Sequence, residues 1–153
     1  MTIIRAAQIA AVCSAVSLVN ISASRADDAA IAQIKKESGT VYATRDGKRV
    51  DIKAGDELYE KDVLDTGADG TIGVTFTDNS VLSLGPNSEV SLAEYRFDSS
   101  NFNGAMTTDI KKGTLTMVSG DIARSSPGAM KVTTPTAILG VRGTSFAVDV
   151  GGN

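Results

Sequence analysis

The side chains best placed for catalysis in this sequence are five acids that lie close together. They are Asp56, Glu57, Glu60, Asp62 and Asp65. Two such carboxylates could serve as acid and base in glycoside hydrolysis. However, Lys61 interrupts the group, and turn-forming residues surround it. The chain also has no Trp and only seven Phe and Tyr with which to build a sugar platform. We therefore predict no catalytic residue and no enzymatic activity.

Metal, cofactor and anion sites are equally weakly indicated. The segment "DTGADG" (65–70) resembles a calcium loop. An EF-hand loop that starts at Asp65 needs a bidentate Glu at its twelfth position, which is Phe76 here. We interpret the segment as a turn and predict no metal site and no cofactor. Lys111 and Lys112 could form a small basic patch, but a solvated turn before Gly113 is the favoured interpretation.

The residue types that are missing exclude several reaction classes. The chain has no His, and its single Cys is Cys13. Histidine bases, histidine zinc ligands and Ser-His or Cys-His nucleophiles are therefore excluded. Residues 1–26 contain two cations and no acid, so the remainder has 13 basic and 18 acidic residues and a net charge of −5. This charge disfavours binding to nucleic acid and to anionic membrane surfaces.

Residues 1–26 have the pattern of a secretory signal peptide. Arg5 precedes a moderately apolar stretch, and Ser24-Arg25-Ala26 offers small residues at a cleavage site. Polar residues within the stretch argue against the alternative of an uncleaved membrane anchor. We predict cleavage after Ala26, a periplasmic or secreted location and no stable membrane insertion afterwards. Cys13 would leave with this segment, so the exported part can form no disulfide.

The rest of the chain has the pattern of an all-β domain. Residues 27–38 are predicted to be an exposed lead-in, either a short helix or disordered, and 39–150 the β domain. Alternation on both sides of Asp46-Gly47 predicts a tight hairpin. Ile72, Val74 and Phe76 fall on one strand face. Turn signals recurring every 8 to 10 residues or so fit a compact sandwich, a roll or stacked solenoid coils.

Arg142 is the one cation in the apolar segment "TPTAILGVRGTSF" (134–146). A guanidinium remains charged, and burying it unpaired costs several kcal/mol. It must therefore face solvent or be hydrogen-bonded. We favour a structural clamp, in which Arg142 ties the last strands to an earlier turn. A direct role in partner binding and an anion site are the alternatives.

At these residues the sequence resembles the FecR domain family, whose closing motif runs Thr-Pro-x-Ala and then Val-Arg-Gly-Thr-x-Phe. The upstream segments "GTVYATRDGKRVDIKAGDELYEKDVLDTGADG" and "TFTDNSVLSLGPNSEV" agree in order, so the resemblance covers about residues 38 to 150. It implies an all-β extracytoplasmic domain. The best-known members relay iron-siderophore signals and also carry an anti-sigma region and a transmembrane helix, neither of which we expect in this protein. The motif positions, all interface candidates, are Thr134, Pro135, Arg142, Gly143, Thr144 and Phe146.

The sequence thus predicts a stand-alone, non-enzymatic FecR-like protein-interaction module. It would act as a sensor or scaffold in envelope signalling by binding an envelope protein, with β-augmentation at an exposed edge strand as a plausible docking mode. The alternative is a self-associating envelope structural or adhesin-like protein.

Overall fold

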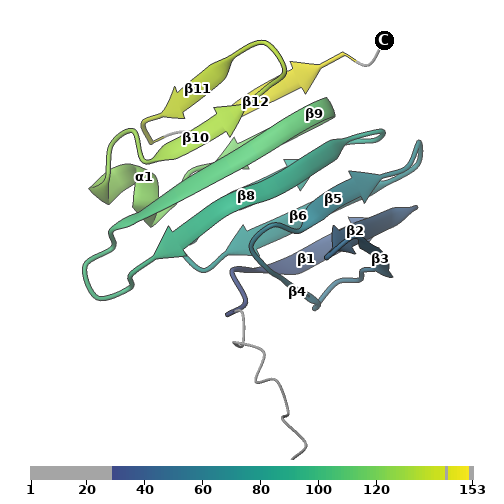
Figure 1. The fold of residues 1–153 in the computed structure, drawn as a ribbon, viewed down its shortest axis with the longest axis horizontal. Coiled ribbons are helices and arrows are strands. Elements are labelled where there is room, and N and C mark those ends of the chain that lie inside the picture. Colours follow the sequence, from purple (N-terminus) through teal and green to yellow (C-terminus); the bar gives the residue numbers. More distant parts are fainter. Residues whose placement is uncertain (1–28, 144, 152–153) are drawn as a thin grey trace, which may run out of the picture.

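The computed structural model describes residues 29–143 and 145–151, which form a β-rich body with one short helix (Figure 1). The predicted signal peptide lies outside the described residues. The elements are β1 (Ala32–Ser38), β2 (Val41–Arg45), β3 (Lys48–Asp51), β4 (Glu57–Leu58), β5 (Val63–Thr66), β6 (Thr71–Phe76), β7 (Val81–Leu84), β8 (Glu89–Phe97), β9 (Gly104–Val118), α1 (Asp121–Ser125), β10 (Met130–Thr133), β11 (Ile138–Val141) and β12 (Ser145–Val150).

The strands form one curled sheet with two halves that share β9. Sheet A has the order β4-β1-β6-β7-β9-β12, and sheet B has the order β3-β2-β5-β8-β9-β10-β11. All neighbours are antiparallel except β9 and β10. The prediction of an all-β fold is confirmed, and its form is a half-barrel rather than stacked solenoid coils.

The long strand β9 passes from sheet B to sheet A at Gly113. Residues up to Lys112 pair with β8, and residues from Leu115 pair with β7. Gly113 has φ +87°, and a Cβ there would lie 2.2 Å from Ser88 Oγ. Glycine is needed at this point because the conformation and the close approach both exclude a side chain.

Alternating side chains explain most of the strand positions. Ile72, Val74 and Phe76 of β6 are buried, as the sequence predicts. In β7 the buried residues are Leu82 and Leu84, whereas Val81 faces outward. The rings of Phe76 and Tyr95 stack with centroids 5.4 Å apart, so sheet A packs against sheet B. The core therefore lies between the two halves of the curled sheet.

The Asp46-Gly47 hairpin is also confirmed. Arg45 pairs with Lys48, and the two residues between them have φ +51° and +74°. Positive φ at both central positions is typical of the tight turns that match strand twist.

The prediction for the lead-in segment is wrong. Residues 32–38 are neither a helix nor an exposed lead-in: they form β1, which pairs with β6 and buries Ile34. Burial between two strands outweighs the weak helical signals, and a register shift between Ile34 and Lys36 disguises the alternation. Residues 121–125 form the short helix α1. Within the described ranges, no helix has the length and apolar character needed to cross a membrane.

Candidate functional site

The closing segment begins with a tight turn between β10 and β11. The Thr134 N–H donates to Ala137 O at 2.8 Å, and Thr134 Oγ1 accepts from Ala137 N at 2.9 Å. Pro135 follows Thr134, where a fixed φ suits a turn and no N–H donor is needed. Thr134 and Pro135 therefore determine how β11 returns along β10.

Strand β11 is an open edge of sheet B. Among the described residues it pairs only with β10, with Thr133 opposite Ile138 and Lys131 opposite Gly140. Hydrogen-bonded and non-hydrogen-bonded pairs alternate in an antiparallel ladder, and the Thr134–Ala137 pair is hydrogen-bonded. The backbone N–H and C=O groups of Ile138 and Gly140 therefore point away from β10, toward solvent.

The side chains of this edge are apolar and partly uncovered. Ile138 is 71% exposed and Leu139 is 39% exposed, whereas Val141 is buried. The strand Ile138–Val141 contains no charged residue. An edge that combines free backbone groups with exposed apolar side chains is able to pair with another strand.

The structure places Arg142 in solvent, which disagrees with the predicted clamp. The residue is exposed, and none of the ion pairs within the described part of the chain involves it. The reason is its position just beyond an edge strand, where no neighbouring strand covers it. A Cβ added at Gly140 or Gly143 would meet no atom within 4 Å, so these glycines allow no close approach.

The remaining motif residues lie around this edge. Gly143 has φ +44° and bends the chain between β11 and β12. Phe146 is half-buried on β12 and packs against the core. Thr144 lies outside the described residues. Thr134, Pro135, Arg142 and Gly143 thus border the β11 edge, whereas Phe146 lies on β12 opposite Met117 of β9 and packs against the core.

The arginine that does tie strands to a distant turn is Arg45. Its Nε and Nη2 donate to Oδ1 and Oδ2 of Asp62 at 2.8 and 2.7 Å. Asp62 is fully buried and also accepts from the Tyr59 N–H at 2.9 Å. The hydrogen bond to Asp62 raises the pKa of Arg45 above its usual range. Hairpin β2–β3 is thereby linked to the segment before β5.

The other candidate carboxylates are held in turns or pairs. Asp56 Oδ2 accepts from the Lys53 N–H at 2.8 Å, and Glu57 Oε2 accepts from the Tyr59 hydroxyl at 3.2 Å. In the segment 65–70, which we interpret as a turn, Asp69 Oδ1 accepts a hydrogen bond from the Thr40 N–H at 3.1 Å. This hydrogen bond lowers the pKa of Asp69. No group of three or more acidic side chains that could hold a metal ion is found in the described ranges.

Lys111 and Lys112 neither lie in the predicted turn nor form an independent basic patch. Both lie in β9, and their Nζ atoms are 2.9 and 3.7 Å from the carboxylate of Glu89. The hydrogen bond from Lys111 lowers the pKa of Glu89. Asp65, on the neighbouring strand β5, has its pKa raised by burial and by the charge of Glu89.

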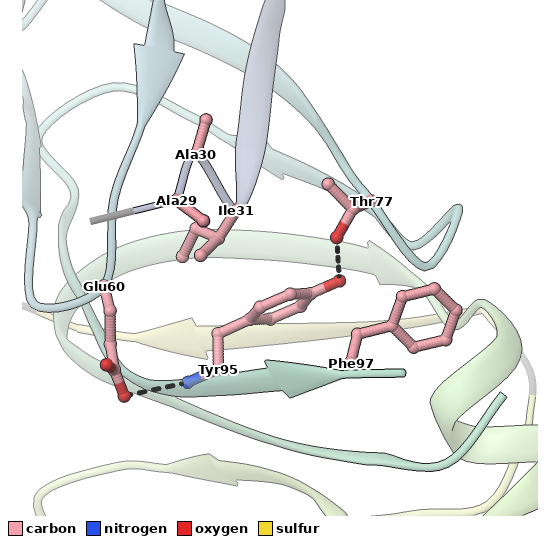
Figure 2. Close-up of a pocket in the computed structure, with 7 residues that line it drawn as sticks. All are labelled: Ala29, Ala30, Ile31, Glu60, Thr77, Tyr95 and Phe97. Atoms are coloured by element: carbon pink, nitrogen blue, oxygen red, sulfur yellow. Dashed lines mark hydrogen bonds between the residues drawn. The ribbon is translucent and has the colours of Figure 1, made fainter. Parts of the chain in front are cut away.

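A pocket around Tyr95 is a feature that sequence reasoning missed. It has a volume of about 280 Å³ and is lined by Ala29, Ala30, Ile31, Glu60, Thr77, Tyr95 and Phe97. We call it the Tyr95 pocket. Figure 2 shows the Tyr95 ring between Glu60 and Phe97, with Ile31 and Thr77 above the ring. The Tyr95 N–H donates to Glu60 Oε1 at 3.3 Å.

Behind this pocket lies a buried polar network centred on Asp78. Its carboxylate accepts from the hydroxyls of Ser80 at 2.7 Å and Tyr95 at 3.2 Å. Its N–H donates to Tyr95 Oη at 2.9 Å, and Thr77 Oγ1 lies 2.8 Å from the same oxygen. Burial raises the pKa of Tyr95, so the hydroxyl stays neutral. The sequence signals only a turn at Asp78, because its partner lies 17 residues away.

A protein-family model matches the part of the chain that contains most of these strands. The family model described as FecR protein matches residues 62–153. Searches among curated proteins and solved structures gave no match. The matched range begins at Asp62, later than the resemblance that starts near residue 38, yet β1 and β2 pair with strands inside it. It includes the buried acid of the Arg45 pair, the Tyr95 strand and the whole closing segment. On this match, which covers more than half of its length, the chain belongs to the FecR protein family.

Proposed function

We propose that this protein is an exported regulator that acts without catalysis, by binding a protein partner in the cell envelope. Membership of the FecR family supports a signalling role carried out through protein–protein contacts. The role as a sensor or scaffold and the periplasmic or secreted location are parts of this proposal. The observation that carries it is the open apolar edge at β11, which lies inside the family-matched range.

Within the described residues the curled sheet has four edge strands, and they differ in how they are protected from pairing with a strand of another protein. Strand β3 has the sequence Lys48-Arg49-Val50-Asp51, and charges of this kind discourage strand pairing. Strand β4 has only two residues, and β12 carries Asp149. Strand β11 is uncharged. This contrast favours β11 as the strand to which a partner would add its own.

An added strand would satisfy the outward backbone groups of Ile138 and Gly140 and cover the exposed side chains of Ile138 and Leu139. Backbone hydrogen bonds supply affinity in this mode, and side-chain pockets supply specificity. Thr134, Pro135 and Gly143 would position the edge, and Arg142 at its end would contact the partner directly.

The test is capture of the partner in the native envelope with a matched pair of variants. Ile138→Lys places a charge on the β11 edge, and Val50→Lys makes the same kind of change on the opposite edge strand β3, where Val50 is 38% exposed. A photo-crosslinker at Leu139 traps the contact in living cells. We expect one envelope protein to be enriched with the unmodified chain and with Val50→Lys, and lost at least about tenfold with Ile138→Lys. A protein that captures no envelope partner in any form contradicts the proposal.

Self-association along the same edge is the second candidate function. Residues 130–143 contain Lys131 and Arg142 but no acid. Two copies joined along β11 would therefore bring cations together without opposite charges, which disfavours this pairing. We expect light scattering to give the mass of one chain at all concentrations tested. A stable polymer that Ile138→Lys dissolves would instead favour the structural or adhesin-like function.

A further inference from the structure

The Tyr95 pocket lies beside β8, three strands away from the β11 edge along sheet B, where the chain enters β1. Its volume of about 280 Å³ is close to the lower limit of ligand pockets, about 300 Å³. This space suits one long side chain rather than a cofactor. Its walls include the apolar groups of Ala30, Ile31 and Phe97, which can cover an alkyl stem.

The charge of the pocket is negative. Glu60 is exposed at one end, and only its Oε1 accepts a hydrogen bond within the described structure, from the Tyr95 N–H. The fully buried carboxylate of Asp78 lies behind the Tyr95 hydroxyl, 3.2 Å from it. Neither Glu60 nor Asp78 takes part in any ion pair of the described residues. The pocket lining contains no basic side chain.

We infer that the Tyr95 pocket binds a lysine or arginine side chain of a partner protein. The alkyl stem would pack on Ile31 and Phe97, and the cation would reach the free Oε2 of Glu60 at the mouth. Long basic side chains bury their stems in this manner while the charged end stays near water. This site goes beyond the proposed function, because it is independent of β11 and assigns the chemistry of a second contact.

A neighbouring aromatic side chain extends this surface. The ring centroid of Phe102 lies 6.5 Å from that of Phe97, and Phe102 is 52% exposed. Phe102 also has φ +60°, which is uncommon for a bulky residue. Exposed aromatic side chains beside a pocket are typical of the centres of protein interfaces. The basic side chain would thus enter beside an apolar platform that the rest of the partner can cover.

The direct test uses three five-carbon probes whose head groups are positive, neutral and negative: pentylammonium, pentanol and pentanoate. Each is titrated into the ¹⁵N-labelled full chain while amide shifts are recorded. We expect pentylammonium to give saturable shifts at Ile31, Thr77 and Tyr95, pentanol to bind more weakly, and pentanoate to give none there. Equal binding of pentanoate and pentylammonium, or shifts that spread over the surface without saturation, would overturn the inference.

Two charge-neutralising variants provide the matched comparison. Glu60→Gln keeps an oxygen that can accept the Tyr95 N–H but removes the charge, and we expect pentylammonium to bind about three- to tenfold more weakly. Glu37→Gln makes the same change on β1, away from the pocket lining, and should leave binding as it is. Unchanged affinity in Glu60→Gln contradicts the assignment of the cation to Glu60.

Other occupants of the pocket give distinct results. Affinity for pentylammonium that rises when residues 1–26 are removed would assign the pocket to this chain's own Arg25. Amide shifts at Tyr95 that depend on protein concentration without a probe would assign it to a second copy. Either result overturns the inference. Loss of partner capture by Ile138→Lys concerns β11 alone, so the proposed function and the pocket can fail separately.

Discussion

Arg45 and Asp62 form a bidentate ion pair, with N–O distances of 2.8 and 2.7 Å, between residues 17 positions apart. The guanidinium also lies 4.2 Å from the centre of the Tyr59 ring. Asp62 is fully buried, whereas the Arg45 side chain is 34% exposed. The Arg45 guanidinium therefore covers the buried Asp62 carboxylate and shields it from solvent.

Replacing Arg45 by Ala should destabilise the protein markedly. A buried carboxylate left without its partner costs about 3–5 kcal/mol, and partial exposure of Arg45 reduces this to about 2–3 kcal/mol. Urea unfolding followed by circular dichroism measures the loss. Arg96→Ala is the control, because its pair with Glu94 is on the surface, and it should cost less than about 0.5 kcal/mol. Similar losses in the two variants would contradict a special role for Arg45.

Gly113→Ala should be among the most damaging small substitutions, because β9 passes between the two halves of the sheet there. The new Cβ would lie 2.2 Å from Ser88 Oγ at a φ of +87°. We expect a loss of more than about 3 kcal/mol, measured by thermal unfolding. Gly128→Ala separates the two causes, since Gly128 has a similar φ of +84° but open space around it. That control should lose only about 1 kcal/mol.

Asp65→Asn should stabilise the protein at neutral pH. Burial and the charge of Glu89 raise the pKa of Asp65, so its ionised form is disfavoured in the folded state. Ionised Asp65 therefore lowers stability above its folded pKa, and Asn removes this cost. The advantage should shrink as the pH falls through the folded pKa toward the unfolded value, because Asp65 then becomes neutral in the folded protein first.

The measurement for Asp65 is urea unfolding at several pH values. Asp51→Asn on exposed strand β3 is the control and should change stability little throughout. An advantage of Asp65→Asn that persisted unchanged into strong acid would show that the cause is not the charge of Asp65.

Arg142→Ala should weaken partner binding without lowering stability. Arg142 is exposed and forms none of the ion pairs within the described ranges, so the expected change in unfolding free energy is below about 0.5 kcal/mol. Lys48→Ala on edge strand β3 removes the same charge elsewhere. Partner capture should fall with Arg142→Ala only. A melting temperature lowered by several degrees would restore the clamp in place of the binding role.

The local sequence pattern was sufficient to predict a structural feature wherever a residue and its neighbours in the sequence determine that feature. The Asp46-Gly47 hairpin follows from turn chemistry, and the buried face of β6 follows from alternation at Ile72, Val74 and Phe76. Residues 32–38 show the limit of such reasoning. The shift between Ile34 and Lys36 breaks the alternation, and pairing with β6 is what makes the segment a strand.

The amino-acid sequence by itself determined the strand-rich character, the absence of histidine chemistry and the family's closing segment, because these depend on composition and local order. Only the tertiary structure decided which arginine pairs with a buried acid, which edge stays open and where a pocket forms. Arg45 and Asp62 meet because β2 and β5 pair as neighbouring antiparallel strands. Tyr95 and Asp78 meet because the sheet curls and brings its two halves together. Arg142 stays in solvent because it follows the edge strand β11, which pairs only with β10 among the described strands.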